Sequence, residues 1–319
     1  MYGSIKRDAV YINNLRGFLL REYGIESLNI IPAKRGYYGE TWMVGAAGQS
    51  YFVKLDYSAA HKSIYERSFP VIEQLHNHDI DFISRIVKTA DGRLSARYNG
   101  AVLGVFDWID GNNIQNERTK IAEYEMLSKI YTIPADGLTI PREDFSGDSA
   151  KRFFKMWAAL GDNNIDSLFE KNRAKLERRA ARLKHFSALC RGDASGFVIT
   201  HGDPGGNVIM NGEKFYIVDW DGPVLAPPER DAWFSCLYPQ FSGWAEASFH
   251  KALLDNGIEY ALRPERLAYY CYHSFFFYLT EYLDTWFDVG DRFGNMAKKL
   301  DEYFHCWIEE QIKYADQKY

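Results

Sequence analysis

Two short segments of this 319-residue chain concentrate side chains that could do chemistry. Residues 199–207 read Ile-Thr-His-Gly-Asp-Pro-Gly-Gly-Asn, and residues 215–221 read Phe-Tyr-Ile-Val-Asp-Trp-Asp. Asp203, Asn207 and Asp219 supply carboxylate and amide oxygens, which hard divalent cations prefer as ligands. The first segment alone is also a good turn sequence, because Gly, Pro, Asp and Asn are favoured turn formers. The second segment, a short strand and turn later, favours a functional site over a simple turn.

Together these segments resemble the catalytic and metal-binding segments shared by protein kinases and small-molecule kinases. Residues 219–221, Asp-Trp-Asp, run into residues 225–231, Leu-Ala-Pro-Pro-Glu-Arg-Asp, and this stretch is especially similar to spectinomycin-type aminoglycoside phosphotransferases. The resemblance spans most of the chain in the order of its elements, with specific motifs in residues 51–66 and 199–231. It implies a kinase that transfers the γ-phosphate of a nucleotide to a hydroxyl of a small molecule.

Phosphoryl transfer needs in-line positioning of the reactants and cancellation of charge on the phosphate oxygens. The resemblance makes Asp219 and Asn207 the protein ligands of Mg²⁺ and lets Asp203 accept the proton of the attacking hydroxyl. It also implies that His201 and Asp231 support the catalytic loop. The family usually places four residues between the catalytic Asp and the metal-binding Asn, whereas three stand here. Two of the three are glycines, which can tighten the path, but the short loop leaves ligation by Asn207 open.

The first third of the chain carries the expected nucleotide site. Lys54 and Phe52 share a strand face by alternation, and the resemblance makes Lys54 the lysine that binds the α- and β-phosphates, steadied by Glu66 of the following helix. Residues 36–40, Gly-Tyr-Tyr-Gly-Glu, form either a phosphate-covering loop or an ordinary turn. ATP is the expected donor, and GTP is the alternative. The further expected nucleotide contacts are Gly36, Gly39, the linker Phe106, Asp107, Trp108 and Ile109, and the apolar walls Val44, Phe52, Ile109 and Val218.

A stretch dense in carboxylates and aromatic rings is the candidate acceptor site. Glu281, Asp284 and Asp288 are spaced by three and four residues and therefore share one helix face. Together with aromatic rings such as Trp286, these groups could hold a cationic acceptor. The alternative is a solvated acidic face beside a core aromatic stripe. The residues expected to bind the acceptor are Asp221, Glu281, Asp284, Trp286 and Asp288.

The elements that must position these residues fall into a strand-rich part and a helix-rich part. Apolar patterning first predicts helices over residues 10–23 and 63–77 and strands over residues 28–33, 41–46, 49–55, 84–89, 93–98 and 101–108. It then predicts helices over residues 118–131, 149–160, 165–190, 264–287 and 295–314. The expected fold is α+β and bilobal, like the protein kinases. Residues 1–109 form a small β-rich, nucleotide-binding N-lobe, and residues 110–319 form a larger helical C-lobe with the catalytic loop and acceptor site.

The composition disfavours nucleic acid and anionic membranes as binding partners. The net charge is −5, and no run of Lys or Arg forms the cluster that nucleic acid or an anionic membrane would select. Neither a signal core nor an 18-residue apolar run appears, so a cytoplasmic protein is expected. The sequence does not encode the oligomeric state.

Three functions remain in competition. The first is an antibiotic-resistance kinase for an aminoglycoside or a spectinomycin-like aminocyclitol. The second is a metabolic kinase for choline, thiamine, a hydroxy amino acid or a sugar. The third is a degenerate kinase that only binds nucleotide or a partner protein. Retention of Lys54, Asp203, Asn207 and Asp219 disfavours the third.

Overall fold

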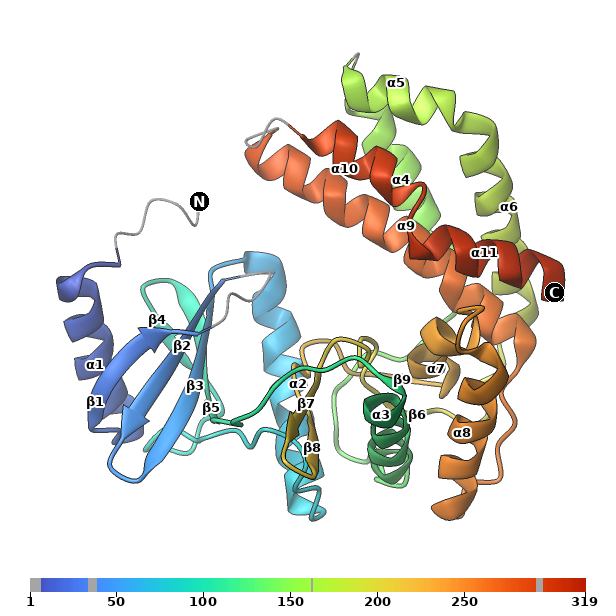
Figure 1. The fold of residues 1–319 in the computed structure, drawn as a ribbon. Coiled ribbons are helices and arrows are strands. Elements are labelled where there is room, and N and C mark those ends of the chain that lie inside the picture. Colours follow the sequence, from blue (N-terminus) through green and yellow to red (C-terminus); the bar gives the residue numbers. More distant parts are fainter. Residues whose placement is uncertain (1–6, 34–38, 162, 291–294) are drawn as a thin grey trace. The chain divides into compact units, whose positions relative to one another are not determined.

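The computed structural model describes residues 7–33, 39–161, 163–290 and 295–319, and the chain divides into two compact units (Figure 1). The first unit comprises residues 1–141 and 201–224, and the second comprises residues 142–200 and 225–319. The strands expected to bind nucleotide therefore share a unit with the segment that carries Asp203 and Asp219.

The first unit contains a five-stranded antiparallel sheet (Figure 1). Its order is β1 (Ser27–Pro32), β2 (Glu40–Ala46), β3 (Gln49–Asp56), β5 (Ala101–Asp107) and β4 (Ala96–Tyr98). One face packs on α1 (Ala9–Tyr23), which begins where the Asp8 carboxylate accepts two backbone N–H groups and ends at Gly24 with a φ of 67°.

The other face of the sheet receives α2 (Ala59–Asn77). The ring of Phe69 packs edge-on against Phe106 with centroids 5.4 Å apart. A Cβ at Gly104 would lie 2.8 Å from the Phe69 ring, so the strand needs glycine at this position to let the helix approach. The same helix also brings Tyr65 to this side of the sheet, beside Lys54.

Two expected strands differ from the structure. Residues 84–89 form no strand: Ile86 makes a single bridge to Phe106, and the Val87 N–H donates to the Val105 carbonyl at 2.8 Å. The expected strand over residues 93–98 is reduced to β4, because the chain before it is used in a turn in which the Thr89 hydroxyl binds the backbone of Arg93. The remaining elements of this unit are α3 (Glu117–Ile130), β7 (Val208–Asn211) and β8 (Lys214–Ile217).

The second unit is built around the long helix α9 (Pro264–Val289), against which α4, α6, α7, α10 and α11 pack (Figure 1). Two expected helices are each split: α5 and α6 meet at Asn172, whose side-chain amide donates to the Leu168 carbonyl, and α10 and α11 are separated by residues 304–306. The other elements are α4 (Asp148–Ala158), α5 (Asn164–Lys171), α6 (Arg173–Cys190), β6 (Val198–Thr200), β9 (Val224–Ala226), α7 (Glu229–Cys236), α8 (Ser242–Asp255), α10 (Met296–Tyr303) and α11 (Trp307–Lys318).

The α+β class, with strands first and helices second, is confirmed. None of the described helices combines the length and apolar character that crossing a bilayer requires.

Candidate functional site

The β7–β8 hairpin brings the two motif segments together. Val208 of β7 pairs with Ile217 of β8, and one residue further the Val218 N–H donates to the Asn207 carbonyl at 2.9 Å. Asn207 is thus opposite Val218 at the open end of the hairpin, and Asp219 follows directly. The two expected metal ligands are therefore neighbours in space although they are far apart in the chain.

His201 holds the backbone of both segments. Its Nδ1 accepts from the Asp203 N–H at 3.2 Å, so Nε2 is the protonated nitrogen and donates to the Val218 carbonyl at 2.9 Å. The ring is buried, and its edge contacts Trp220 with centroids 4.6 Å apart. A histidine whose two ring nitrogens both bond the backbone has the geometry of a loop support.

The loop from Asp203 to Asn207 closes on itself despite its short length. The Asn207 N–H donates to the Pro204 carbonyl at 3.0 Å, and the Asn207 side-chain nitrogen donates to the Asp203 carbonyl at 2.7 Å. Because the amide nitrogen is used in this way, Oδ1 is the atom of Asn207 that can ligate a metal. The Asp203 side chain itself is exposed on this loop.

A buried cation that sequence reasoning missed lies beside this loop. A Cβ placed on Gly205 would be 3.6 Å from Nζ of Lys120. Lys120, on α3, forms a two-pronged ion pair with Glu123 at 2.9 and 2.7 Å, and both side chains are buried. Their spacing of three residues predicts such a pair, but only the tertiary structure places it at the loop.

Lys54 joins the hairpin end to the sheet. Its Nζ lies 2.9 Å from Oδ1 of Asp219 and also donates to Asp221, and the lysine side chain is only 10% exposed. The Tyr65 hydroxyl lies 3.1 Å from Asp56 and 3.4 Å from Asp221, and its ring lies beside the ammonium. Lys54, Asp219 and Asp221 thus form one charged cluster supported by tyrosine.

The cluster sets the protonation of its members. Burial alone would lower the pKa of Lys54, but the carboxylates of Asp221 and Asp219 outweigh it and raise that pKa. Burial would raise the pKa of Asp219, yet the charge and hydrogen bond of Lys54 lower it. For Asp221, burial and the adjacent Asp219 charge raise the pKa despite Lys54. At neutral pH Lys54 is charged and Asp219 is ionised, as a metal ligand must be.

The backbone of Asp219 is strained. Its φ is 65°, a left-handed conformation that costs a non-glycine residue about 1–2 kcal/mol. The Asp221 N–H donates to the Asp219 carbonyl at 2.8 Å and helps hold this turn. Strain of this kind clusters at functional sites.

Glu66 lies away from Lys54. Its carboxylate bonds Arg97 at 2.7 Å and its side chain is 57% exposed. The reason is helical periodicity. Tyr65, Phe69 and Ile72 lie on the buried face of α2. Glu66, one residue after Tyr65, therefore points toward solvent. That spacing was available in the sequence and identifies Tyr65, which was missed, as the residue facing Lys54.

The apolar walls divide between the two faces of the sheet. Phe52 pairs with Met43 and lies on the face of Lys54, whereas Val44 pairs with Tyr51 and is buried on the α1 face. The structure therefore does not bring Val44 to Lys54; Met43 has that orientation. Val218 is partly exposed at the hairpin end.

The expected purine-binding linker is already partly bonded. The Asp107 N–H donates to the Arg85 carbonyl at 2.9 Å, its carbonyl accepts from Ser84, and the Trp108 N–H donates to the Ser50 carbonyl at 3.0 Å. With the residues that the structure describes, the Trp108 carbonyl and the Ile109 N–H make no hydrogen bond. The ring of Phe106 packs against that of Phe52, with centroids 6.3 Å apart.

The glycine-rich loop is described only at its end. Gly36 lies outside the described residues. Gly39 has a φ of 90°, and a Cβ there would lie 2.1 Å from the Leu55 carbonyl oxygen. Close backbone approach to β3 therefore requires glycine at this position.

The expected acceptor residues do not form one set. Asp221 belongs to the Lys54 cluster in the first unit, whereas Glu281, Asp284 and Trp286 are on α9 in the second. Asp284 forms an ion pair with Arg152, while Glu281 and Trp286 are half-buried. Asp288 also falls on α9, but its side chain lies outside the described residues. Asp231 is buried in the first turn of α7, where its N–H donates to the Pro228 carbonyl at 3.1 Å.

The residues present fit a magnesium ion that takes two ligands from the protein and the others from nucleotide phosphates and water. Within the described ranges, no group of three or more His, Cys, Asp or Glu side chains could hold a metal. Asp219 is ionised and 50% exposed, and Asn207 offers Oδ1 beside it. Two oxygen ligands suit Mg²⁺, which keeps several waters and binds substrate phosphates.

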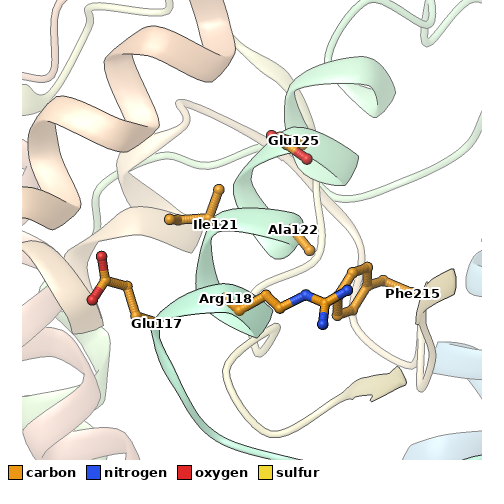
Figure 2. Close-up of a pocket in the computed structure, with 6 residues that line it drawn as sticks. All are labelled: Glu117, Arg118, Ile121, Ala122, Glu125 and Phe215. Carbon is orange, nitrogen blue, oxygen red and sulfur yellow. The ribbon is translucent and has the colours of Figure 1, made fainter. Parts of the chain in front are cut away.

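A pocket of about 490 Å³ is lined by residues of α3 and by Phe215 of β8, and none of the expected site residues lines it (Figure 2). Figure 2 shows the Arg118 side chain extending along the ring of Phe215, with the guanidinium carbon 5.3 Å from the ring centroid. The same guanidinium also forms an ion pair with Glu213. We assign this pocket no part in the candidate site.

The sequence profile of the phosphotransferase enzyme family matches residues 29–269. Curated protein sequences show no significant match to the chain. Similar solved structures include a spectinomycin phosphotransferase, APH(9)-Ia, in complex with ADP and spectinomycin, which is 20% identical with a TM-score of 0.75 over 95% of this chain and 98% of that chain. An amicoumacin kinase, hAmiN, in complex with AMP-PNP, Ca²⁺ and Ami is 13% identical with a TM-score of 0.66 over 96% and 93%.

The choline kinase LicA from Streptococcus pneumoniae is also similar, at 13% identity and a TM-score of 0.62 over 97% of this chain and 100% of that chain. At these identities the likeness establishes the fold, and it confirms the expected kinase-like architecture. The family match confirms the expected resemblance and the expected class of enzyme, a phosphotransferase.

Proposed function

The chain belongs to the phosphotransferase enzyme family, and from this premise we propose that it transfers the γ-phosphate of ATP, with GTP as the alternative donor, to a hydroxyl of a small molecule. The observation that carries the proposal is the convergence of Lys54 with Asp219 and Asp221 in the same unit as Asp203 and Asn207. A cation for the phosphates, a carboxylate for the metal and a carboxylate for the proton are the parts that phosphoryl transfer needs.

In the proposed reaction the acceptor oxygen bonds to the γ-phosphorus while the bond from that phosphorus to the β–γ bridging oxygen breaks. The electron pair of the broken bond leaves with the nucleoside diphosphate. The hydroxyl proton passes to the exposed carboxylate of Asp203, which the loop bonds of His201 and Asn207 hold in place. Asp231 is proposed as a further support of this loop.

Lys54 exchanges its bond to Asp219 for bonds to the α- and β-phosphates and keeps its bond to Asp221, because a lysine that already neutralises two carboxylates is preorganised for anionic oxygens. Asp219 and Asn207 would hold Mg²⁺, which when bound supplies charge that neutralises the phosphate oxygens. Asp221 and Tyr65 then keep the lysine oriented.

The nucleotide base is proposed to lie on the Lys54 face of the sheet. Met43, Phe52 and Val218 would form its apolar walls, and the Trp108 carbonyl and the Ile109 N–H would bind its edge. Gly36 and Gly39 would flank the loop over the phosphates. We propose residues 1–109 as the nucleotide-binding lobe and residues 110–319 as the lobe that supplies the catalytic loop and the acceptor site.

For the acceptor, we propose a cationic compound, either an aminoglycoside or a spectinomycin-like aminocyclitol. The carboxylates of Glu281, Asp284 and Asp288 on α9, with Trp286, are the groups that would bind its ammonium groups. A quaternary ammonium alcohol such as choline is the second candidate, because the fold also matches a choline kinase over that chain's whole length.

A coupled assay of nucleoside diphosphate release tests this function. ATP or GTP with Mg²⁺ is supplied against a panel of aminoglycosides, spectinomycin, choline, thiamine and sugars, and release without acceptor gives the background. We expect one chemical class to raise release above background and to acquire one phosphate by mass. Asp219→Asn should abolish this release. Release that no acceptor stimulates and that Asp219→Asn leaves unchanged would contradict the proposal.

A further inference from the structure

A strongly cationic pocket of about 450 Å³ lies in the second unit, between α6 and α11. Two carboxylates, Glu309 and Asp316, line it together with five cations, so the lining side chains carry a net charge of +3. The whole chain, by contrast, carries −5. The five cations are Lys175, Arg178, Arg179 and Arg182 of α6 and Lys313 of α11.

Helical spacing explains why these cations gather. The four α6 residues stand at positions i, i+3, i+4 and i+7, which places them along one face of the helix. Helix α11 lies near this face, and both helices pack against α9 (Figure 1). Tyr272 of α9 also lines the pocket. The cluster is therefore a product of the fold and not of a run in the sequence.

Both carboxylates are already used. Glu309 accepts from Lys175 at 2.9 Å and pairs with Arg179, and these two cations keep the pKa of Glu309 low although burial alone would raise it. Asp316 pairs with Arg182 at 3.2 Å and accepts from the Tyr272 hydroxyl. Neither carboxylate can neutralise a further cation without giving up one of these partners.

Positive charge is therefore left over in the pocket. Arg178 and Lys313 are exposed, and neither forms an ion pair with any residue in the described part of the chain. Arg179 is almost fully buried over the ring of Phe275, and its Nη1 has no hydrogen-bond partner among the described residues. A buried donor without an acceptor is costly, and an anion nearby would lower that cost electrostatically.

We propose that this pocket binds a small phosphorylated anion with two or more negative charges. The planar fork of arginine matches phosphate oxygens, and a volume of about 450 Å³ falls in the range of small-molecule sites. All the lining residues belong to the second unit, whereas Lys54, Asp203 and Asp219 belong to the first. The inference is independent of the proposed phosphoryl transfer.

Calorimetric titration of the full chain with inorganic pyrophosphate tests this site, with sodium chloride used to match the ionic strength. We expect binding that persists in Lys54→Met, which removes the cation proposed to bind nucleotide phosphates. Binding should weaken at least tenfold in the double variant Arg178→Gln with Lys313→Gln. Because these two side chains are exposed, their loss leaves the core intact.

The matched control is Lys151→Gln with Lys251→Gln, which removes the same charge from exposed positions of the same unit outside the pocket. It should bind pyrophosphate like the wild type. Hydrogen exchange of the wild type gives a second measurement, in which pyrophosphate should protect α6 and α11. The inference is overturned if binding disappears in Lys54→Met and survives the Arg178 and Lys313 changes. It is also overturned if chloride alone gives the same protection.

Discussion

Replacing Lys54 by methionine removes the cation at the centre of the charged cluster and keeps an unbranched apolar stem of similar length. The Lys54 side chain is 10% exposed and its ammonium bonds two carboxylates, so this group is poised to make charge-assisted hydrogen bonds to phosphate oxygens. Such a bond contributes about 1.5–3 kcal/mol. A loss of about 2 kcal/mol corresponds to a fall of roughly 30-fold in kcat/KM for the nucleotide, since about 1.4 kcal/mol is a factor of ten.

Thermal unfolding over a range of pH gives a second readout of Lys54→Met. In the wild type Lys54 holds the pKa of Asp219 below its ordinary value, so this contribution to stability is present above that value and is lost as the pH falls through the folded-state pKa. Without Lys54, repulsion between Asp219 and Asp221 raises the pKa values of the pair. The difference in Tm between wild type and variant should therefore be larger at pH 7 than at pH 3.

The matched control is Lys88→Met, because Lys88 is a half-exposed lysine of the same unit with a single ion pair, to Glu73. Its loss should change stability by less than about 1 kcal/mol and leave catalysis unchanged. The assays are steady-state kinetics with varied nucleotide and calorimetric Kd measurement. If Lys54→Met kept kcat/KM within twofold of the wild type, Lys54 would have no role in binding the phosphates.

Three further changes test the other parts of the site. Asp203→Asn should lower kcat by about 10²–10⁴-fold while the calorimetric Kd for nucleotide stays near the wild-type value, and equal loss of both would make Asp203 structural. Tyr65→Phe should lower the free energy of unfolding in urea by about 1 kcal/mol, because the hydroxyl that donates its one proton to the Asp56 carboxylate, with Asp221 as the more distant acceptor, is lost. Glu66→Gln on the exposed side of the same helix should leave that free energy nearly unchanged, and the reverse order would contradict the assignment of the α2 faces. Asp284→Asn with Asp288→Asn should raise the KM for a cationic acceptor and spare the KM for nucleotide, and an unchanged acceptor KM would remove α9 from the acceptor site.

Local patterns predicted much of the site. Alternation placed Phe52 and Lys54 on one face, and the structure has them there. The same counting, carried through the hairpin turn after Ala46, pairs Val44 with Tyr51 and would have identified Met43 as the neighbour of Phe52. The strand register set by this turn therefore places Val44 on the face opposite to Lys54.

Helical periodicity was likewise available on α2 and α6. Tyr65 and Phe69 mark the buried face of α2, which excludes Glu66 from the sheet side. On α6, the cations of the basic pocket recur every three or four residues and therefore do not form a continuous run of Lys and Arg in the sequence. A helical projection would have shown both faces.

Other features depend on tertiary structure. The proximity of Lys120 to Gly205 and the sharing of Lys54 by Asp219 and Asp221 join segments far apart in sequence. No local pattern specifies such contacts, because they arise from the packing of α3 and the sheet around the β7–β8 hairpin.

The first unit is assembled from two stretches of chain, residues 1–141 and 201–224, with residues 142–200 intervening. A ribosome adding roughly 5–20 residues per second needs about 3–12 s to synthesise that intervening stretch. During this time the nascent sheet carries Lys54, which is buried in the folded protein, before its partners Asp219 and Asp221 have been synthesised. Synthesis therefore imposes an order on folding, because the charged cluster of Lys54, Asp219 and Asp221 can form only after the hairpin emerges. A polypeptide arrested before residue 219 would lack this cluster however well its strands had formed.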